Sequence, residues 1–167
     1  ALLSRLAAEV FSPDEVAVVE GDKDVATELL RLPFDHIFFT GSPQIGKVVM
    51  RAAAEHLTSV TLELGGKSPA IVDQTAALRD AAEKIVWGKS INAGQTCVAP
   101  DYVLVHEQVR DQLVEEIGAV VRRFYDAEGQ GVAASDSLAR IVNDHHFRRV
   151  LGLLDDARQR GATVALG

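Results

Sequence analysis

The single cysteine of the chain, Cys97, lies in a loop of small and polar residues that begins at Asn92. One thiol cannot form an internal disulfide, so Cys97 is either a small core residue or a reactive group. Gly94 permits a tight backbone path, and the small neighbours leave room for a ligand beside the sulfur. Most free cysteines are core residues, but these neighbours favour a nucleophile.

Glu63 is the acidic residue that stands out, because it lies in an otherwise apolar segment just before a glycine hinge, with only Leu64 between it and the pair Gly65-Gly66. A carboxylate at the end of a strand, beside a cleft, can act as a general base. Taken alone, Glu63 is more simply interpreted as an exposed residue at a strand end. Lys67 could pair with Glu63 or bind a phosphate, but a solvated lysine is the more common case.

A third candidate is the turn from Gly41 to Gly46, which lies between a predicted strand and a predicted helix. Phosphates and dinucleotides bind at such turns, because the free N–H groups at the start of the helix point at the ligand. The spacing matches neither G-x-G-x-x-G nor a Walker loop, since Val48 replaces the Ser or Thr that binds magnesium. Spacing alone therefore favours an ordinary strand-to-helix turn.

The histidines do not predict a metal site. His145 and His146 are adjacent, so on a helix they point in different directions, and neither has a second ligand four residues away. We expect Trp87 and Phe147 in the core.

In the first part of the chain, predicted helices and strands alternate with short connections. This order is typical of a parallel sheet that is covered on both faces. Asp22 or Asp24 is expected to cap the second helix, and Pro33 to end it. The expected elements are a helix over 1–11, a strand over Val16–Glu20, a helix around 25–30, a strand over His36–Thr40, a helix over 45–53 and a strand over Val60–Leu64.

Two glycines and a proline, within 65–69, mark a boundary or hinge before the second part. Asp136 or Ser137 is expected to cap a last helix that runs to Gly161. Its side facing the core is expected to carry Leu138, Ile141, Val142, Val150, Leu151 and Leu154. The other expected elements are a strand over Ala70–Val72, a helix over 77–86, a strand over Tyr102–Val105, a helix over 109–124 and a surface loop over 126–137. The chain opens within a helix and stops at 162–167, a segment typical of a strand, so we expect a piece of a longer protein.

Composition narrows the class of partner. The chain has 167 residues, 47% of them apolar, and a formal net charge of −7. An acidic chain without basic clusters argues against nucleic acid and anionic membranes as partners. No apolar run is long enough to span a bilayer, and no signal peptide is visible. One unpaired cysteine suits a reducing cytoplasm.

Three motifs, taken together, resemble the aldehyde dehydrogenase family. They are Phe39–Gly46, Leu62–Pro69 and Asn92–Cys97, and the interval from Glu63 to Cys97 is also that of the family. The resemblance runs from end to end of the chain. Pro69, the segment 97–102 and the segment 141–147 most resemble the class 3 branch, and within it the bacterial coniferyl aldehyde dehydrogenases.

The resemblance implies a catalytic role for two residues. Cys97 would attack the aldehyde carbon to give a thiohemiacetal, and hydride transfer to the cofactor would leave a thioester. Glu63 would activate the water that hydrolyses the thioester, and the backbone N–H of Cys97 would supply half of the oxyanion hole. A thiol is a strong nucleophile once it is ionised, and a thioester is labile enough for water and a base.

The resemblance also implies NAD or NADP as the cofactor. Gly41 and Ser42 would lie under its pyrophosphate, and Gly46 would let the following helix pack closely. Leu64 and Gly65 would lie near the nicotinamide ring. No metal is implied.

The fold class implied is α/β, with a Rossmann-type parallel sheet followed by a second, partial α/β catalytic domain. Residues 1–64 would be the C-terminal part of the NAD(P)-binding domain, and residues 65–167 the N-terminal part of the catalytic domain. We expect a small-molecule aldehyde as substrate, and an intact protein that is a cytoplasmic homodimer. The fragment alone is expected to be inactive, because the asparagine of the family's oxyanion hole precedes Ala1.

Two other functions remain open from the sequence. Reduction of an acyl phosphate or an acyl-CoA on the same fold also uses a cysteine thioester, but it needs no hydrolytic water and so no base such as Glu63. A non-catalytic binding protein could keep the fold, although the presence of both Cys97 and Glu63 argues against it.

Overall fold

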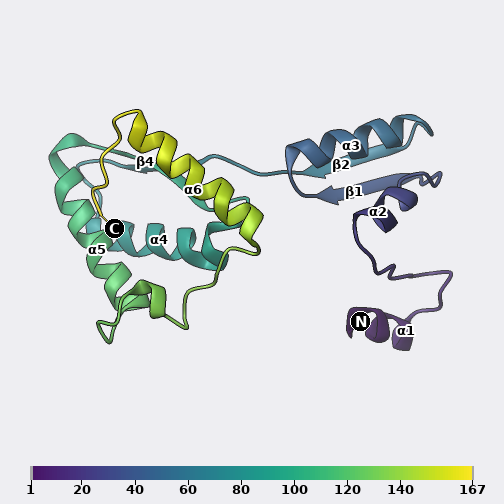
Figure 1. The fold of residues 1–167 in the computed structure, drawn as a ribbon, viewed down its shortest axis with the longest axis horizontal. Coiled ribbons are helices and arrows are strands. Elements are labelled where there is room, and N and C mark those ends of the chain that lie inside the picture. The colour runs from purple at the N-terminus through teal and green to yellow at the C-terminus, as the bar shows by residue number, and fades with distance from the viewer. Residues whose placement is uncertain (1, 167) are drawn as a thin grey trace. The chain divides into compact units, whose positions relative to one another are not determined.

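The computed structural model describes residues 2–166 of the chain. The chain divides into two compact units, Ala1–Leu64 and Gly65–Gly167, and Figure 1 shows the helices and strands of each. Along the sequence, the division lies between Leu64 and Gly65, the first glycine of the pair Gly65-Gly66. Within the described residues, each unit contains one pair of parallel strands.

The first unit is built around a strand–helix–strand crossover. Strand β1 (His36–Thr40) is followed by α3 (Pro43–Ala54) and then by β2 (Ser59–Glu63). The two strands pair in parallel along their whole length, and α3 lies along the pair in Figure 1. Residues three and four positions apart share a helix face, which accounts for the buried side of α3: Gly46, Val49 and Ala53.

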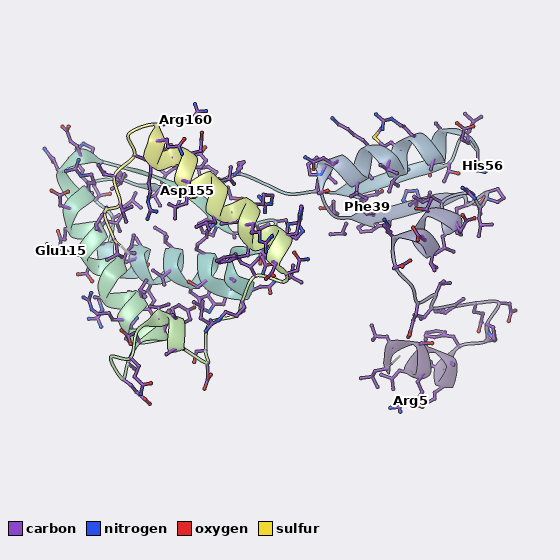
Figure 2. The ribbon with its side chains drawn as sticks, in the orientation of Figure 1. Arg5, Phe39, His56, Glu115, Asp155 and Arg160 are labelled. Atoms are coloured by element: carbon purple, nitrogen blue, oxygen red, sulfur yellow. The ribbon has the colours of Figure 1, made fainter. Side chains whose placement is uncertain are left out.

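Two helices precede this crossover, α1 (Leu2–Val10) and α2 (Lys23–Leu29). Asp22 caps α2, because its side chain accepts a hydrogen bond of 2.9 Å from the N–H two residues further on, as such caps do. His56, labelled in Figure 2, follows α3 and donates from Nε2 to the carbonyl of Arg31 at 3.0 Å. This bond ties the end of α3 to the segment after α2.

The second unit begins with a second parallel pair, β3 (Ser68–Val72) and β4 (Pro100–Val105), joined through α4 (Leu78–Ser90). Helix α5 (Arg110–Tyr125) packs beside α4, and α6 (Asp144–Gln159) follows. Apolar side chains from both strands and both packed helices form the core. Its buried members are Val72, Leu78, Ala82, Val86, Leu113 and Val120. Short 3-10 turns occur at Ile91–Gly94, Glu107–Val109 and Val132–Ala134.

Most of the expected elements are confirmed, with bounds shifted by a few residues at most. The segment Val16–Glu20 is an exception, because it is irregular and exposed. Its β-branched residues suit a strand, but no neighbouring strand in the described chain pairs with it. The expected parallel pairing of strands is confirmed, in two sheets of two strands each among residues 2–166. Apolar residues on their outer faces remain exposed: Phe38, Ile71 and Leu104.

The last helix also differs from the prediction. It begins at Asp144, where Asn143 is the cap and its side chain accepts from the N–H of His146 at 2.9 Å, so neither Asp136 nor Ser137 caps it. No residue of α6 is buried, and Phe147 is 53% exposed, which contradicts its expected core position.

Two smaller expectations are also wrong. Trp87 is 60% exposed, because it lies one residue, and therefore about 100° around the helix, beyond the buried Val86 of α4. The described residues of the terminal segment, 162–166, form no strand, and Gly167 lies outside the described residues. None of the helices within residues 2–166 combines the length and the apolar character that crossing a bilayer requires.

Candidate functional site

Cys97 lies in the turn between the 3-10 segment Ile91–Gly94 and β4, and its side chain is exposed. The turn is closed by the N–H of Ala99, which donates to the carbonyl of Thr96 at 3.1 Å. Ala99 itself is 6% exposed, so it anchors the turn in the unit. Of the two interpretations left open by the sequence, the structure therefore excludes a core cysteine and presents the thiol to solvent.

The backbone before Cys97 is left-handed at three successive residues. The φ angles are 52° at Asn92, 54° at Ala93 and 75° at Gly94. Glycine adopts this conformation freely, whereas an alanine loses on the order of 1–2 kcal/mol in it. Such a conformation persists only where neighbouring groups hold it in place.

Gln95 supplies hydrogen bonds that hold this backbone. Its side-chain Nε2 donates to the carbonyls of Asn92 at 2.8 Å and of Arg140 at 3.2 Å, and its Oε1 accepts from the N–H of Val142 at 3.0 Å. At about 1 kcal/mol each, these bonds can offset the strain at Ala93. Gln95 is not among the site residues predicted from the sequence, although it is the one long polar side chain in a loop of small residues.

Gly66 supports the turn from the other side. A Cβ atom at Gly66 would lie 2.6 Å from the carbonyl oxygen of Cys97, whereas a Cβ at Gly65 would meet nothing within 4 Å. The contact at Gly66 is closer than real Cβ atoms allow, so only glycine fits there without a shift of the backbone. The two adjacent glycines thus differ: Gly66 packs against the Cys97 main chain, and Gly65 does not.

A small charged cluster lies beside the same turn. Lys67 Nζ is 2.9 Å from Asp101 Oδ2, and Lys89 Nζ is 3.9 Å from Asp101 Oδ1. The hydrogen bond from Lys67, helped by the charges of both lysines, lowers the pKa of Asp101. Lys67 is therefore paired, although its side chain is 81% exposed and solvent screens the pair.

Glu63 ends β2 in the first unit, paired with Thr40 on β1, and its side chain is exposed. The carbonyl of Glu63 accepts from the N–H of Gly41 at 3.0 Å, which continues the ladder into the turn after β1. A Cβ at Gly41 would collide with the ring of Phe39, the β1 residue labelled in Figure 2. Glu63 and the glycine turn therefore lie at the same end of the strand pair, the carboxyl end.

The start of α3 suits an anionic ligand. Ser42 caps the helix, with its Oγ accepting from the N–H of Ile45 at 3.4 Å, and the first turn carries no acidic residue. The positive end of the helix dipole is therefore not neutralised by a carboxylate of its own. Gly46 lets α3 approach β2, since a Cβ there would lie 3.1 Å from Leu64 Cδ2. These residues fit the pyrophosphate of a dinucleotide.

The structure thus gathers Gly41, Ser42, Gly46, Glu63 and Leu64 around one end of β1 and β2 in the first unit. Gly65 and Cys97 belong to the second unit, where the Cys97 main chain lies against the glycine that follows Gly65.

Replacing Gly66 by alanine is expected to lower the free energy of unfolding of the intact protein by about 1–3 kcal/mol, because the added methyl group displaces the Cys97 carbonyl. The matched control, Gly65→Ala, should stay within about 1 kcal/mol of wild type. Urea denaturation measures both. Equal losses at the two positions would contradict the packing described for Gly66.

The Asp101 pair predicts a pH dependence. Because the pKa of Asp101 is lowered in the folded state, its contribution to stability is present above its ordinary pKa and is lost as the pH falls through the lowered value. Asp101→Asn should therefore destabilise the protein at neutral pH, and the difference from wild type should shrink in acid. Thermal melts from neutral pH to pH 3 test this, and 1 M salt should reduce the difference at neutral pH. A difference that does not change with pH would contradict it.

A family profile, related sequences and a solved structure all point to the same family. The profile of the aldehyde dehydrogenase family matches residues 1–167. The chain is 51% identical to a Pseudomonas aeruginosa protein named "Probable coniferyl aldehyde dehydrogenase", with 98% of this chain and 33% of that protein covered. It is 46% identical to a dimeric, NADP-preferring aldehyde dehydrogenase of Mus musculus, with 94% of this chain and 34% of the relative covered.

A solved structure of Staphylococcus aureus AldH in a substrate-bound state is also similar. It has a TM-score of 0.83 and 47% identity, over 95% of this chain and 34% of that one. The chain thus spans about a third of the length of the relatives it matches. With a family profile matched over the whole chain and an α/β fold that aligns with a solved member, this chain belongs to the aldehyde dehydrogenase family.

Proposed function

We propose that the protein containing this chain oxidises an aldehyde to a carboxylic acid, with NAD or NADP as hydride acceptor. The observation that carries this proposal is the exposed thiol of Cys97 at the tip of an anchored turn. An exposed and positioned thiol is available as a nucleophile, whereas a buried one would be inert. Membership of the family supplies the class of reaction.

The first chemical step forms a bond between Cys97 Sγ and the aldehyde carbon, and the carbonyl oxygen takes up the electron pair. The N–H of Cys97 would stabilise this oxyanion. Bound NAD or NADP would supply the chemistry of hydride acceptance. The carbon, now oxidised, remains attached to Cys97 as a thioester, while the proton released from the thiol goes to a base or to solvent.

The second step is hydrolysis of the thioester. Glu63 would take a proton from a water molecule, whose oxygen then attacks the thioester carbon. The carbon–sulfur bond breaks, the acid leaves, and Cys97 recovers its thiolate. A general base of this kind contributes about 10²–10⁴-fold to a rate.

Covalent connection supports the pairing of Glu63 with Cys97. Only three residue steps separate Glu63 from Gly66, so their Cα atoms are at most about 11 Å apart in any arrangement of the chain. Gly66 in turn lies against the Cys97 carbonyl. This short connection is compatible with a carboxylate and a thiol that act on one substrate, as proposed here.

The cofactor would be held mainly by the first unit. Gly41, Ser42 and the start of α3 would bind the pyrophosphate, and Gly46 would let that helix lie close to β2. Leu64 and Gly65 would lie near the nicotinamide. Residues 1–64 would then be the end of the NAD(P)-binding domain, and residues 65–167 the start of the catalytic domain, which agrees with the two compact units.

A finer proposal concerns substrate, assembly and compartment. The 51% identity to the Pseudomonas relative supports an aromatic aldehyde of the coniferyl type, and the similarity to a dimeric relative supports a homodimer. An exposed nucleophilic thiol needs a reducing environment to stay free, which supports the cytoplasm.

The test uses the intact protein with NAD⁺ or NADP⁺ and a panel of aromatic and aliphatic aldehydes. Cys97→Ser should lower turnover on the order of 10³-fold or more, since removal of a nucleophile has effects of that size. Glu63→Gln should still give a burst of about one reduced cofactor per site, because acylation precedes hydrolysis, followed by slow turnover.

Glu55→Gln, an exposed glutamate at the end of α3, is the matched control and should behave as wild type. Normal turnover by Cys97→Ser would overturn the proposed nucleophile. Normal turnover by Glu63→Gln would leave the nucleophile intact and remove the proposed base.

A further inference from the structure

We propose that Gln95 is a positioning residue for Cys97, which it holds by fastening the cysteine turn to the segment Arg140–Val142. The inference rests on the proposed function only in taking Cys97 as the nucleophile. Its evidence is one side-chain amide that bridges two parts of the chain through three main-chain groups.

The chemistry of the three bonds requires an amide. The two hydrogens of Nε2 go to the carbonyls of Asn92 and Arg140, and the Oε1 atom receives the N–H of Val142. A carboxylate in the same place would keep the acceptor but would face two carbonyl oxygens without a hydrogen. Glutamine therefore satisfies all three groups at once, which glutamate cannot do while it is ionised.

The segment that Gln95 reaches is itself fixed. The guanidinium of Arg140 donates to the carbonyls of Leu138 at 2.6 Å, Ala133 at 2.8 Å and Ser135 at 3.2 Å. Immediately after Val142, the side chain of Asn143 caps α6. Gln95 is therefore attached to a folded loop with its own support.

Of the two segments that Gln95 joins, the turn before Cys97 is the one with a strained backbone. Asn92, Ala93 and Gly94 are left-handed, and Asn92 Nδ2 donates back to the carbonyl of Gln95 at 3.2 Å. Loss of the Gln95 side chain would free this backbone to relax towards an ordinary conformation. Cys97 follows two residues later, so its sulfur and its N–H would move with the turn.

The expected effect falls on chemistry more than on binding. The three bonds run to main-chain groups, so the substitution changes no charge at the start of α3 or at Glu63. A displacement of the nucleophile by about 1 Å can lower a rate on the order of 10²-fold. Removal of Gln95 should therefore lower kcat and leave the KM for the cofactor nearly unchanged.

The experiment compares Gln95→Ala and Gln95→Glu with wild type in the intact protein. For Gln95→Ala we expect kcat to fall about 10–100-fold, with the KM for the cofactor close to that of wild type and a small loss of Tm from the missing hydrogen bonds. Gln130→Ala is the matched control and should leave kcat unchanged. Among the hydrogen bonds of residues 2–166, the side chain of Gln130 makes a single local one, from Nε2 to the carboxylate of Glu128 at 3.1 Å.

Gln95→Glu adds a pH signature. Once protonated, a carboxylic acid can donate to one of the two carbonyls while its other oxygen accepts from Val142. The ratio of kcat for Gln95→Glu to that of wild type should therefore rise as the pH is lowered, while the ratio for Gln95→Ala stays flat.

A readout without activity tests the same bridge. Hydrogen exchange of the amides in 92–99 and in 140–142 should rise together in Gln95→Ala and in neither segment of Gln130→Ala, since the bridge protects both sides. Unchanged exchange or unchanged kcat in Gln95→Ala would overturn the proposal. If the wild-type protein lacked aldehyde oxidation, the proposed function would fail by itself, and the exchange experiment would still decide whether the bridge exists.

Discussion

The close approach of two backbones, at Gly66 and at the carbonyl of Cys97, is the constraint on which the proposed site depends. The absence of a side chain at Gly66 lets the main chain of Cys97 lie so close that a Cβ atom at Gly66 would be 2.6 Å from its carbonyl oxygen. Gly66 follows Glu63 by only three residues, so a short piece of chain joins the proposed base to this packed glycine. The glycine pair reads as a simple hinge in the sequence, but its two members differ. Gly66 packs against the Cys97 carbonyl, whereas a Cβ at Gly65 would meet nothing within 4 Å.

The turn that bears Cys97 combines strain with exposure. Three left-handed residues precede the thiol, and an exposed loop with few buried contacts has little apolar packing to hold such a backbone. Hydrogen bonds hold the turn instead of apolar packing. The Gln95 side chain joins it to the segment 140–142, and the N–H of Ala99 donates to the carbonyl of Thr96. The outcome is a thiol that is open to a ligand but attached to a backbone with fixed geometry, as a nucleophile requires.

Local patterns predicted the parts of the structure that depend on local forces. The crossover from β1 through α3 to β2 follows from apolar spacing and short connections. The errors are nonlocal. The segment Val16–Glu20 has strand composition but lacks a partner strand in the described chain. Helix α6 begins only after its Asn143 cap, and the guanidinium of Arg140 binds three carbonyls of the irregular segment before it. Gln95 was missed because its partners lie 45 and 47 positions away.

The central claim is that a carboxylate and a thiol from two units serve one reaction. A crystal structure of the intact protein with NAD⁺ bound tests it most directly, by locating Cys97 Sγ and the carboxylate of Glu63 relative to the nicotinamide. We expect both side chains to line one cavity beside that ring, with room for a single water between the carboxylate and a thioester on Cys97. Side chains that open into separate regions, with no space joining them, would contradict it.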